Sequence, residues 1–409
     1  GIGRCKDGLR LILFTGVTLL ELDRFGGFAI LYNMKIPRFY DDLNKELKPN
    51  KVLVIYGPRQ VGKTTLLKDF LSRTQFKYKL DTGDDIKIQN ILSSSDVEII
   101  KSYAENYELI AIDEAQKIPN IGQGLKILVD HIPGIRIIAT GSSSFELAGQ
   151  IGEPLTGRKN TITLFPIAQK ELAGLHNNFE LKEKLGEWLV YGGYPDVITA
   201  TTREDKIKVL EEILHSYLLK DILELEKVKS SKILLDLLRL IAYQVGNEVS
   251  LTELASRIGI DYKTVARYLD LFEKSFIIYN LRGFSRNLRS EITKKSKYFF
   301  YDNGIRNAIV SNWNALENRD DIGKIWENFL FIERMKKRSY DNIYANIYFW
   351  RTWEQQEIDY IEERDGKFFG YEFKWNDKKK ISEPTQWKAA YDNAGFEVIS
   401  KNNYLDFVK

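Results

Sequence analysis

The stretch GPRQVGKTT, residues 57–65, constrains the fold more than any other feature of the chain. Gly57 and Gly62 bracket four residues, and Lys63 and Thr64 follow at once, which is the spacing of a phosphate-binding loop (P-loop). Glycine lets the backbone turn tightly, so that successive N–H groups and the start of a helix face phosphate oxygens. The preceding KVLVIY reads as a buried strand and GKTTLLKDFL as an amphipathic helix. We therefore expect an α/β domain with a parallel sheet.

The side chains of this loop predict a nucleotide site. Lys63 is expected to reach the β- and γ-phosphates of ATP, and Thr64 to place its hydroxyl on Mg²⁺. The other loop residues are expected to line the nucleotide, and they are Gly57, Pro58, Arg59, Gln60, Val61, Gly62 and Thr65. ATP and Mg²⁺ are the predicted cofactors.

A second nucleotide-site pattern is ELIAIDEAQKI, in which four apolar residues run into Asp113 and Glu114. A continuous apolar run is typical of a buried parallel strand, whose carboxyl end opens onto the ligand site. Asp113 is expected to hold the Mg²⁺ shell, and Glu114 to act as general base on the attacking water. This is a Walker B pattern at the expected distance behind the loop.

Two later segments add candidates for sensing and stabilising the γ-phosphate. The predicted strand GIRIIATGSSSFEL ends in Thr140, Ser142 and Ser143, any of which is expected beside the γ-phosphate. Arg158 lies just before the next predicted strand. In an oligomer it is expected to reach a neighbour's γ-phosphate and stabilise the transition state. The alternative is a surface arginine near a helix end.

The middle of the chain contains a helix-turn-helix pattern. Ser250 and Asp261 read as helix caps and Gly259 as the turn, which leaves Lys263 and Arg267 on the face that would enter a major groove. A β-hairpin, or wing, is expected next, and its basic residues are Arg286, Arg289, Lys294, Lys295 and Lys297. Such a cluster neutralises phosphates, so double-stranded DNA is the predicted partner. The alternative is a winged helix that only packs or binds protein.

The end of the chain predicts a small α/β domain with a second metal site. Asp359 is expected in one strand, and Glu372 and Lys374 in the next, on one face because they are two residues apart. Glu327, from the preceding amphipathic helix, is expected to join both acids around Mg²⁺ or Mn²⁺, with Lys374 acting on the attacking water. This pattern leaves two readings open, metal-dependent DNA cleavage and a domain that only binds DNA.

Five motifs in order carry a family resemblance: the P-loop, IDEAQ, TGSSSFEL, LTGRKNTITLFPI and YGGYPD. Together they resemble the AAA+ ATPases of bacteria and archaea whose C-terminal half is the domain of unknown function 4143. The acid-and-lysine pattern near the end resembles the PD-(D/E)XK nuclease fold, although no proline precedes its first acid. The resemblance covers about residues 34 to 409 and implies a P-loop fold of the ASCE class with ATP binding.

Composition limits the remaining choices. Lys and Arg number 60 against 57 Asp and Glu, so the net charge of +3 indicates no partner. One cysteine and three scattered histidines exclude a thiolate zinc site and disfavour a histidine metal site, which leaves oxygen-ligated Mg²⁺ or Mn²⁺. No stretch is long and apolar enough to span a bilayer, and we expect a cytoplasmic protein.

These patterns predict a division of the chain into parts. Residues 1–33 precede the first methionine, Met34, and contain no capped helix or alternating strand that the core requires. We expect a non-core appendage there, of upstream or foreign origin. The predicted parts are this appendage at 1–33, an AAA+ P-loop core at 34–168, a helical lid at 169–248, a winged helix at 249–312 and a nuclease-like domain at 320–409.

The sequence therefore predicts an ATPase, in monomeric or homo-oligomeric form, that couples Mg-ATP hydrolysis to DNA binding. Metal-dependent DNA cleavage is left open as a further activity. The alternative is an ATP-gated binding switch whose nuclease-like domain does not cut. A P-loop kinase is a third reading. Three features argue against a kinase: the separate sensor strand, Arg158, and a long C-terminal half that resembles DNA-binding proteins.

Overall fold

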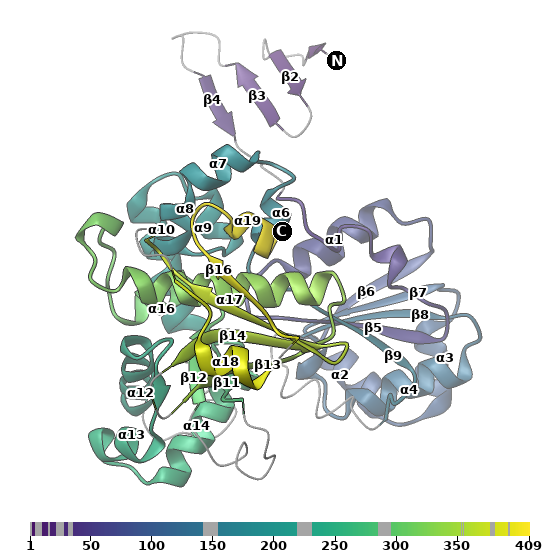
Figure 1. Ribbon diagram of the computed structural model, residues 1–409. Helices are drawn as coiled ribbons and strands as arrows, with labels where there is room; N and C mark the ends of the chain where they lie inside the picture. The colour runs from purple at the N-terminus through teal and green to yellow at the C-terminus, as the bar shows by residue number, and fades with distance from the viewer. Residues whose placement is uncertain are drawn as a thin grey trace.

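The structure of the chain is a computed structural model (Figure 1). It describes the strands at 2–4, 10–14, 17–21 and 28–31, and then residues 36–141, 154–218, 231–284, 296–352, 354, 356–376, 381–391 and 393–409. Figure 1 shows a sheet with its helices on the right, a second sheet crossed by a long helix in the centre, and two helical groups at upper and lower left. None of the helices in these residues is long and apolar enough to cross a bilayer.

The P-loop directly follows β5 in a five-stranded parallel sheet. The strands of this sheet lie in the order β6-β7-β8-β5-β9. The strands are β5 (Lys51–Tyr56), β6 (Tyr78–Thr82), β7 (Leu109–Asp113), β8 (Arg136–Gly141) and β9 (Lys159–Thr163). Strand β5 has apolar side chains on both faces. Leu53 and Ile55 pack with helix α1 (Lys63–Arg73), whereas Val52 and Val54 pack with the opposite layer. That layer comprises α2 (Ile86–Ser93), α3 (Val97–Ala104) and α4 (Ile121–His131).

Short helices follow the sheet: α6 (Gln169–Leu172), α7 (Asn178–Glu183), α8 (Leu185–Tyr191), α9 (Pro195–Thr199) and α10 (Arg203–Glu212). The glycine pair of YGGYPD separates α8 from α9. A Cβ on Gly192, whose φ is 75°, would lie 2.1 Å from a carboxylate oxygen of Asp302. A Cβ on Gly193 would lie 2.6 Å from the carbonyl oxygen of Ile167. The motif is therefore a packing point between the end of the P-loop domain and residues near 302.

A unit that we call the helix–strand module follows. It contains α12 (Ser231–Tyr243), α13 (Leu251–Ile258), α14 (Tyr262–Lys274) and a sheet of β10 (Glu248–Val249), β12 (Ser296–Phe300) and β11 (Ile278–Arg282), in that order. The predicted caps are confirmed. Ser250 accepts from the backbone N–H of Glu253, Asp261 accepts from that of Thr264, and Gly259 ends α13 with a φ of 76°.

The C-terminal domain has one long helix, α17 (Ile322–Tyr340), against a four-stranded sheet in the order β13-β14-β15-β16. The strands are β13 (Asn346–Arg351), β14 (Glu357–Arg364), β15 (Lys367–Phe373) and β16 (Gly395–Ile399), with helices α18 (Thr385–Ala390) and α19 (Tyr404–Val408). Strand β16 is parallel to β15, and the other pairs are antiparallel. The predicted fold class, an α/β chain with a parallel P-loop sheet and a smaller α/β domain, is confirmed.

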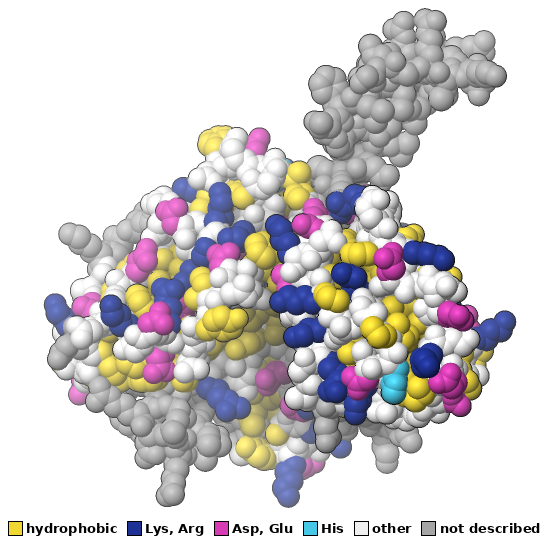
Figure 2. Space-filling model, turned by 90° about the vertical axis from the view of Figure 1, so that its right-hand side faces the viewer, with side chains coloured by type: hydrophobic (Ala, Val, Ile, Leu, Met, Phe, Trp, Pro, Cys, Tyr) yellow, Lys and Arg dark blue, Asp and Glu magenta, His cyan; other side chains and the backbone are white. Residues whose placement is uncertain are grey.

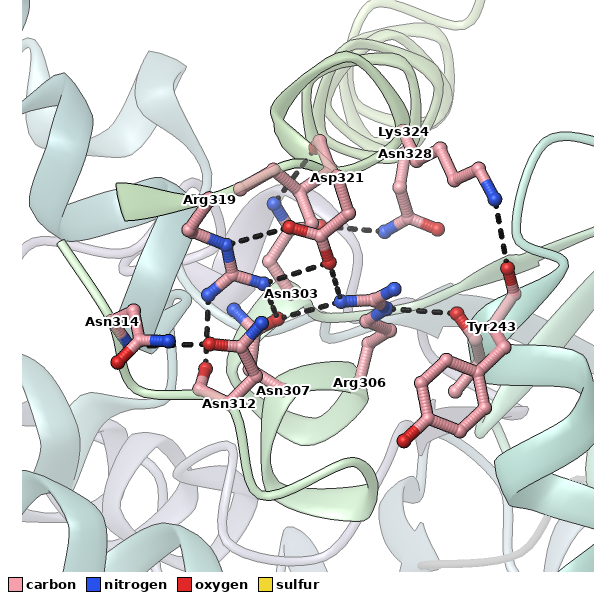
Figure 3. A network of polar contacts seen from close by, with 12 residues as sticks. Tyr243, Asn303, Arg306, Asn307, Asn312, Asn314, Arg319, Asp321, Lys324 and Asn328 are labelled. Carbon is pink, nitrogen blue, oxygen red and sulfur yellow. Dashed lines mark hydrogen bonds and ion pairs between the residues drawn. The ribbon is translucent and has the colours of Figure 1, made fainter. Parts of the chain in front are cut away.

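A buried polar network joins these parts (Figure 3). Asp321, just before α17, accepts from Arg306 of α16 (Asn303–Ile309) and from Arg319 at 2.8 Å. Arg306 also donates to the carbonyl oxygen of Ala242 at the end of α12, at 3.0 Å. Asn307 donates to backbone carbonyls of α8 at 3.1 and 2.8 Å. Hydrogen bonds in a buried network favour one arrangement of its elements, so these helices are fixed to one another.

The first residues contain strands that the sequence analysis did not anticipate. β1 (Ile2–Arg4), β2 (Arg10–Phe14), β3 (Val17–Glu21) and β4 (Phe28–Leu31) pair in chain order as an antiparallel sheet. This sheet pairs with none of the other described strands, and it lies apart from them at the top of Figure 1.

Candidate functional site

The P-loop takes its shape from glycine and from a neighbouring backbone. A Cβ on Gly57 would lie 2.0 Å from the carbonyl oxygen of Leu164, so only glycine fits there. Gly62 has a φ of 91° and begins α1. The ammonium of Lys63 donates to the carbonyl oxygens of Gly57 and Pro58, at 2.9 and 2.6 Å, which folds the side chain back over the loop. The loop thus combines a tight glycine turn, a helix start and a lysine.

The two predicted Mg²⁺ ligands lie together. The hydroxyl of Thr64, in the first turn of α1, donates to Oδ2 of Asp113 at 2.8 Å. The buried hydroxyl of Thr140, from the neighbouring strand β8, donates to Oδ1 of Asp113 and accepts from the backbone N–H of Glu114 at 3.1 Å. The structure therefore brings the ends of β7 and β8 and the start of α1 to one point.

Glu114 follows Asp113 in a constrained backbone conformation. Its φ of 51° is left-handed, which is uncommon outside glycine and marks functional positions. Its Oε2 accepts from the side-chain amide of Gln116 at 2.6 Å. Gly83 packs against it so closely that a Cβ there would lie 2.2 Å from the Glu114 carbonyl oxygen. The carboxylate is thus held beside Asp113 at the carboxyl edge of the sheet.

Sequence reasoning missed Arg38, whose side chain is 8% exposed and holds the loop from behind. Its guanidinium donates to the carbonyl oxygens of Val61 and Phe165, at 2.7 and 2.6 Å, and to the carboxylate of Glu171 at 3.0 Å. Glu171 in turn accepts from the backbone N–H groups of Phe39 and Ala168. No local pattern marks these residues, because their partners lie 23 to 133 positions away.

Arg158 lies at the opposite edge of the sheet from the loop. It precedes β9, and its guanidinium pairs with Asp130 at 2.7 Å. The carbonyl oxygen of Arg158 accepts from Val52 near the start of β5, whereas Gly57 follows the end of this six-residue strand. At a rise of roughly 3.3 Å per residue, the separation between Val52 and Gly57 along the strand is about 16 Å. Arg158 therefore does not contribute to the nucleotide site of its own chain.

Several predicted residues lie outside the described part of the chain: the sensor candidates Ser142 and Ser143, and the basic residues Arg286, Arg289, Lys294 and Lys295. Lys263 and Arg267 lie exposed on α14. The prediction for Lys297 is wrong. Its side chain is 2% exposed and cannot contact DNA phosphates at the surface, because β12 directs it into the C-terminal domain.

Lys297 belongs to a group that we call the carboxylate–lysine cluster: Glu327 of α17, Glu357 and Asp359 of β14, Glu372 of β15, Lys297 of β12, and Lys374 just after β15. The ammonium of Lys297 lies 2.6 Å from Glu357, 3.4 Å from Glu327 and 3.9 Å from Asp359. That of Lys374 lies 2.6 Å from Glu372. Burial raises the pKa of Glu327 to about 8 and that of Glu372 to about 7.

The cluster does not form the predicted metal shell. Glu327, Asp359 and Glu372 come from the three expected elements, and Lys374 lies beside Glu372 as predicted, but the ammonium of Lys297 lies between Glu327 and Asp359. Across the residues that the structure describes, no three His, Cys, Asp or Glu side chains are grouped so as to hold a metal ion. The sequence did not reveal this because Lys297 reaches the acids from a separate module. As arranged, the residues do not fit Mg²⁺ or Mn²⁺, and we derive no cleavage step.

Comparison with known proteins identifies the first domain. Residues 49–173 match the family described as the AAA domain. Residues 49–173 form an AAA domain. Two domains of unknown function also match, one numbered 8612 at 182–317 and one numbered 4143 at 322–405. The expected resemblance to AAA+ ATPases with a domain of unknown function 4143 is confirmed. AAA domains bind nucleotide, usually with Mg²⁺, so this chain carries a nucleotide-binding domain of ATPase type.

Proteins of similar sequence align with most of this chain. An uncharacterized protein of Mycobacterium tuberculosis is 26% identical over 343 residues, which is 83% of this chain and 74% of that protein. One of Methanocaldococcus jannaschii is 24% identical over 406 residues, 92% of this chain and 88% of that protein. Among solved structures, a signal transduction ATPase with numerous domains (STAND) from Pyrococcus horikoshii, with a tetratricopeptide repeat sensor, aligns at 15% identity and a TM-score of 0.28. The alignment covers 73% of this chain and 44% of that one.

Proposed function

We propose that this chain is an ATPase that hydrolyses Mg-ATP in its AAA domain and uses the helix–strand module to bind double-stranded DNA. The observation that carries the first half is the 2.8 Å hydrogen bond between Thr64 and Asp113. These two oxygens come from elements 49 positions apart, and oxygen ligands of this kind are the ones Mg²⁺ uses beside phosphates. Their meeting at the P-loop supports a metal–nucleotide site.

The other residues take their roles from their positions around this pair. Lys63 is within reach of the loop mouth, where phosphate oxygens would replace the carbonyl oxygens of Gly57 and Pro58 as its acceptors. Glu114, beside Asp113, is the general base for water. Arg38 is a positioning residue that holds the loop backbone, and Thr140 positions Asp113.

Arg158 could contact a nucleotide only in a second copy of the chain. Its distance from its own P-loop excludes a role there, and its position at an exposed corner of the AAA domain leaves it accessible to a neighbour. We infer that any contribution of Arg158 to hydrolysis is made in a homo-oligomer, where its cation would stabilise the charge on a neighbour's γ-phosphate.

The helix–strand module supports DNA binding through its second helix. Two helices joined at Gly259, followed by paired strands, fit a winged helix. On α14 the exposed side chains near its start are Tyr262, Lys263 and Arg267, which is the end that reads a major groove. The net charge of the chain, +3, does not by itself attract DNA, and basic and acidic side chains are interspersed on the face shown in Figure 2. The positive charges near the start of α14 would therefore have to supply the attraction.

For the C-terminal domain the geometry favours binding over cutting. Its order of elements, one helix, three antiparallel strands, a helix and a parallel strand, fits the PD-(D/E)XK fold. The ammonium of Lys297, which lies among the acids of the carboxylate–lysine cluster, disfavours a catalytic metal there. We therefore prefer the ATP-gated DNA-binding switch, with a nuclease-like domain that does not cut, to the cleaving enzyme.

The nucleotide half is tested by titrating Mg-ATP into the full chain by calorimetry. Lys63→Ala should weaken ATP binding by at least about 100-fold, since a buried charge-assisted contact to phosphate is lost. Lys68→Ala, an exposed lysine on the same helix, is the matched control and should bind as wild type does. Equal affinity in Lys63→Ala and wild type would remove the basis of the proposed function.

A further inference from the structure

The backbone and the side chain of Lys297 belong to different parts of the molecule. The residue lies on β12, where it pairs with Glu248 of β10 and Leu281 of β11, so its backbone belongs to the helix–strand module. Its ammonium ends among side chains of α17 and β14, in the C-terminal domain. One residue therefore connects the two units.

The ammonium is surrounded by acceptors. Glu357 lies 2.6 Å away and accepts a hydrogen bond, and Glu327 lies at 3.4 Å and Asp359 at 3.9 Å. The ring of Phe349, on β13, lies 5.2 Å from the ammonium and closes another side, within cation–π range. With 2% of the residue exposed, these groups replace water around the charge.

Further contacts hold the two units at the same place. Gly283, just after β11, forms a parallel bridge with Phe349, and the backbone N–H of Phe284 donates to the Phe349 carbonyl oxygen at 2.7 Å. Arg351 of β13 lies 3.8 Å from Glu248 of β10. The sheet of the module is thus continued into the C-terminal sheet beside the lysine.

We propose that the ammonium of Lys297 is the resident cation of the carboxylate–lysine cluster, in the position where a nuclease of this fold would hold a divalent metal, and that it locks the helix–strand module to the C-terminal domain. The lock rests on the proposed function only in naming the module as the DNA-binding part. The contact itself, in which a lysine ammonium takes the place of a metal ion, does not depend on ATP or DNA.

The arrangement follows from electrostatics. Four carboxyl groups crowded into one cluster would repel one another if all were ionised, and two ammonium groups offset part of that repulsion. Removing one partner of a buried ion pair is costly, because the charge that remains has lost both water and partner. A divalent ion entering the cluster would have to displace an ammonium that the chain itself holds in place. The remaining acid, Glu372, is paired with Lys374 at 2.6 Å.

The first experiment measures Mn²⁺ binding to the full chain without nucleotide, by electron paramagnetic resonance. Only binding that Asp359→Asn removes is assigned to the cluster, which sets aside any ion at Asp113. Wild type should show no such binding at millimolar Mn²⁺. Lys297→Met should bind one additional Mn²⁺ per chain. The double variant Lys297→Met/Asp359→Asn should lose this additional ion. Asp359-dependent binding in wild type, or none in folded Lys297→Met, would overturn the proposal.

A second measurement tests the proposal even if Lys297→Met does not fold. Glu357→Gln removes the nearest partner of the ammonium, so the lock predicts a melting temperature lower by roughly 5 °C or more. Glu363→Gln, on the same strand outside the cluster, should change it little. A metal site without its metal would respond in the opposite direction, because removing one of several crowded acids relieves repulsion. A rise in the melting temperature of Glu357→Gln would therefore overturn the lock. Neither experiment involves ATP or DNA, so failure of the proposed function leaves both readouts unchanged.

Discussion

At the scale of single residues, Thr140, which the sequence predicts beside the γ-phosphate, contacts Asp113 and Glu114. Its hydroxyl is fully buried, donates to Asp113 and accepts from the backbone N–H of Glu114 at 3.1 Å. It therefore holds both the carboxylate of Asp113, the proposed Mg²⁺ ligand, and the backbone of Glu114, the proposed general base. A valine at this position has nearly the same shape but can do neither.

We predict that Thr140→Val lowers the rate of ATP hydrolysis by about tenfold or more and the free energy of unfolding by about 1–3 kcal/mol. The reason is that a buried acceptor and a buried donor lose their common partner. Steady-state turnover and thermal melting measure the two effects. Thr252→Val, at an exposed position on α13, is the control. Wild-type turnover in Thr140→Val would show that Asp113 and Glu114 are held by other groups.

Asp302 gives the molecule a pH dependence that the sequence does not reveal. Its carboxylate accepts from the backbone N–H groups of Gly193 and Ile305 at 2.7 and 3.1 Å. Burial nevertheless raises its pKa from 3.8 to about 6. The native carboxyl therefore holds its proton more tightly than the unfolded one. This contribution to stability is fully present below about pH 4 and is lost as the pH rises through about 6.

Asp302→Asn should remove that contribution. Relative to the variant, wild type should lose stability between pH 4 and pH 7, by up to about 3 kcal/mol for a difference of about two pKa units. The measurement is the melting temperature of both proteins at several pH values in this range. Parallel pH profiles for the two proteins would contradict the assignment.

The nucleotide residues could be predicted because their information is local. The spacing of Gly57, Lys63 and Thr64 specifies one loop, and Asp113 ends an apolar run that only a buried strand explains. Lys297 was misplaced for the opposite reason. Its basic neighbours in sequence suggest an exposed wing, but its partners Glu327 and Glu357 lie 30 and 60 positions away. Burial of a single lysine depends on such distant contacts.

At the scale of elements, the helix pair of the module could be predicted in detail, since caps and turn residues act within a few positions. Ser250, Gly259 and Asp261 all have the predicted roles. The continuation of the module's sheet into the C-terminal domain could not be predicted. It depends on the bridge between Gly283 and Phe349, which no local sequence pattern predicts.

We predict that Lys263→Glu/Arg267→Glu weakens DNA binding at low salt by at least about tenfold for any sequence. It should also make the dependence on salt less steep by roughly two units, since fewer counterions are released. Fluorescence anisotropy over a range of salt concentrations measures both quantities. Lys68→Glu/Lys87→Glu makes the same change in net charge on the AAA domain and should bind normally. If both double variants bind alike, α14 is not the contact.

The sheet of β1–β4 gives another prediction at this scale. Because it pairs with none of the other described strands, a chain that begins at Met34 should keep the melting temperature and ATP turnover of the full chain. Calorimetry and steady-state assays on the two chains make the comparison. A loss well above the 1 kcal/mol typical of a point change would show that this sheet stabilises the AAA domain.

At the scale of the whole molecule, one apolar core runs from the α1 face of the P-loop sheet through the helices to the C-terminal domain. Arg38 and Glu171 connect the loop to α6, and Glu333 of α17 accepts from the backbone N–H of Gln169 at 2.6 Å. The network around Asp321 and the lock at Lys297 continue this connection to the helix–strand module. The nucleotide site and the helix–strand module, which we propose binds DNA, are thus joined by packed elements rather than by a linker.

The central claim, that the AAA domain hydrolyses Mg-ATP through Glu114 in a molecule that binds DNA, is tested most directly by steady-state turnover with and without duplex DNA. Wild type should hydrolyse ATP, and DNA should change the rate. Glu114→Gln should still bind ATP but turn over at least about 100-fold more slowly, as expected for loss of a general base. Lys68→Ala should match wild type in both conditions. Glu114→Gln turnover equal to that of wild type, with or without DNA, would contradict the account.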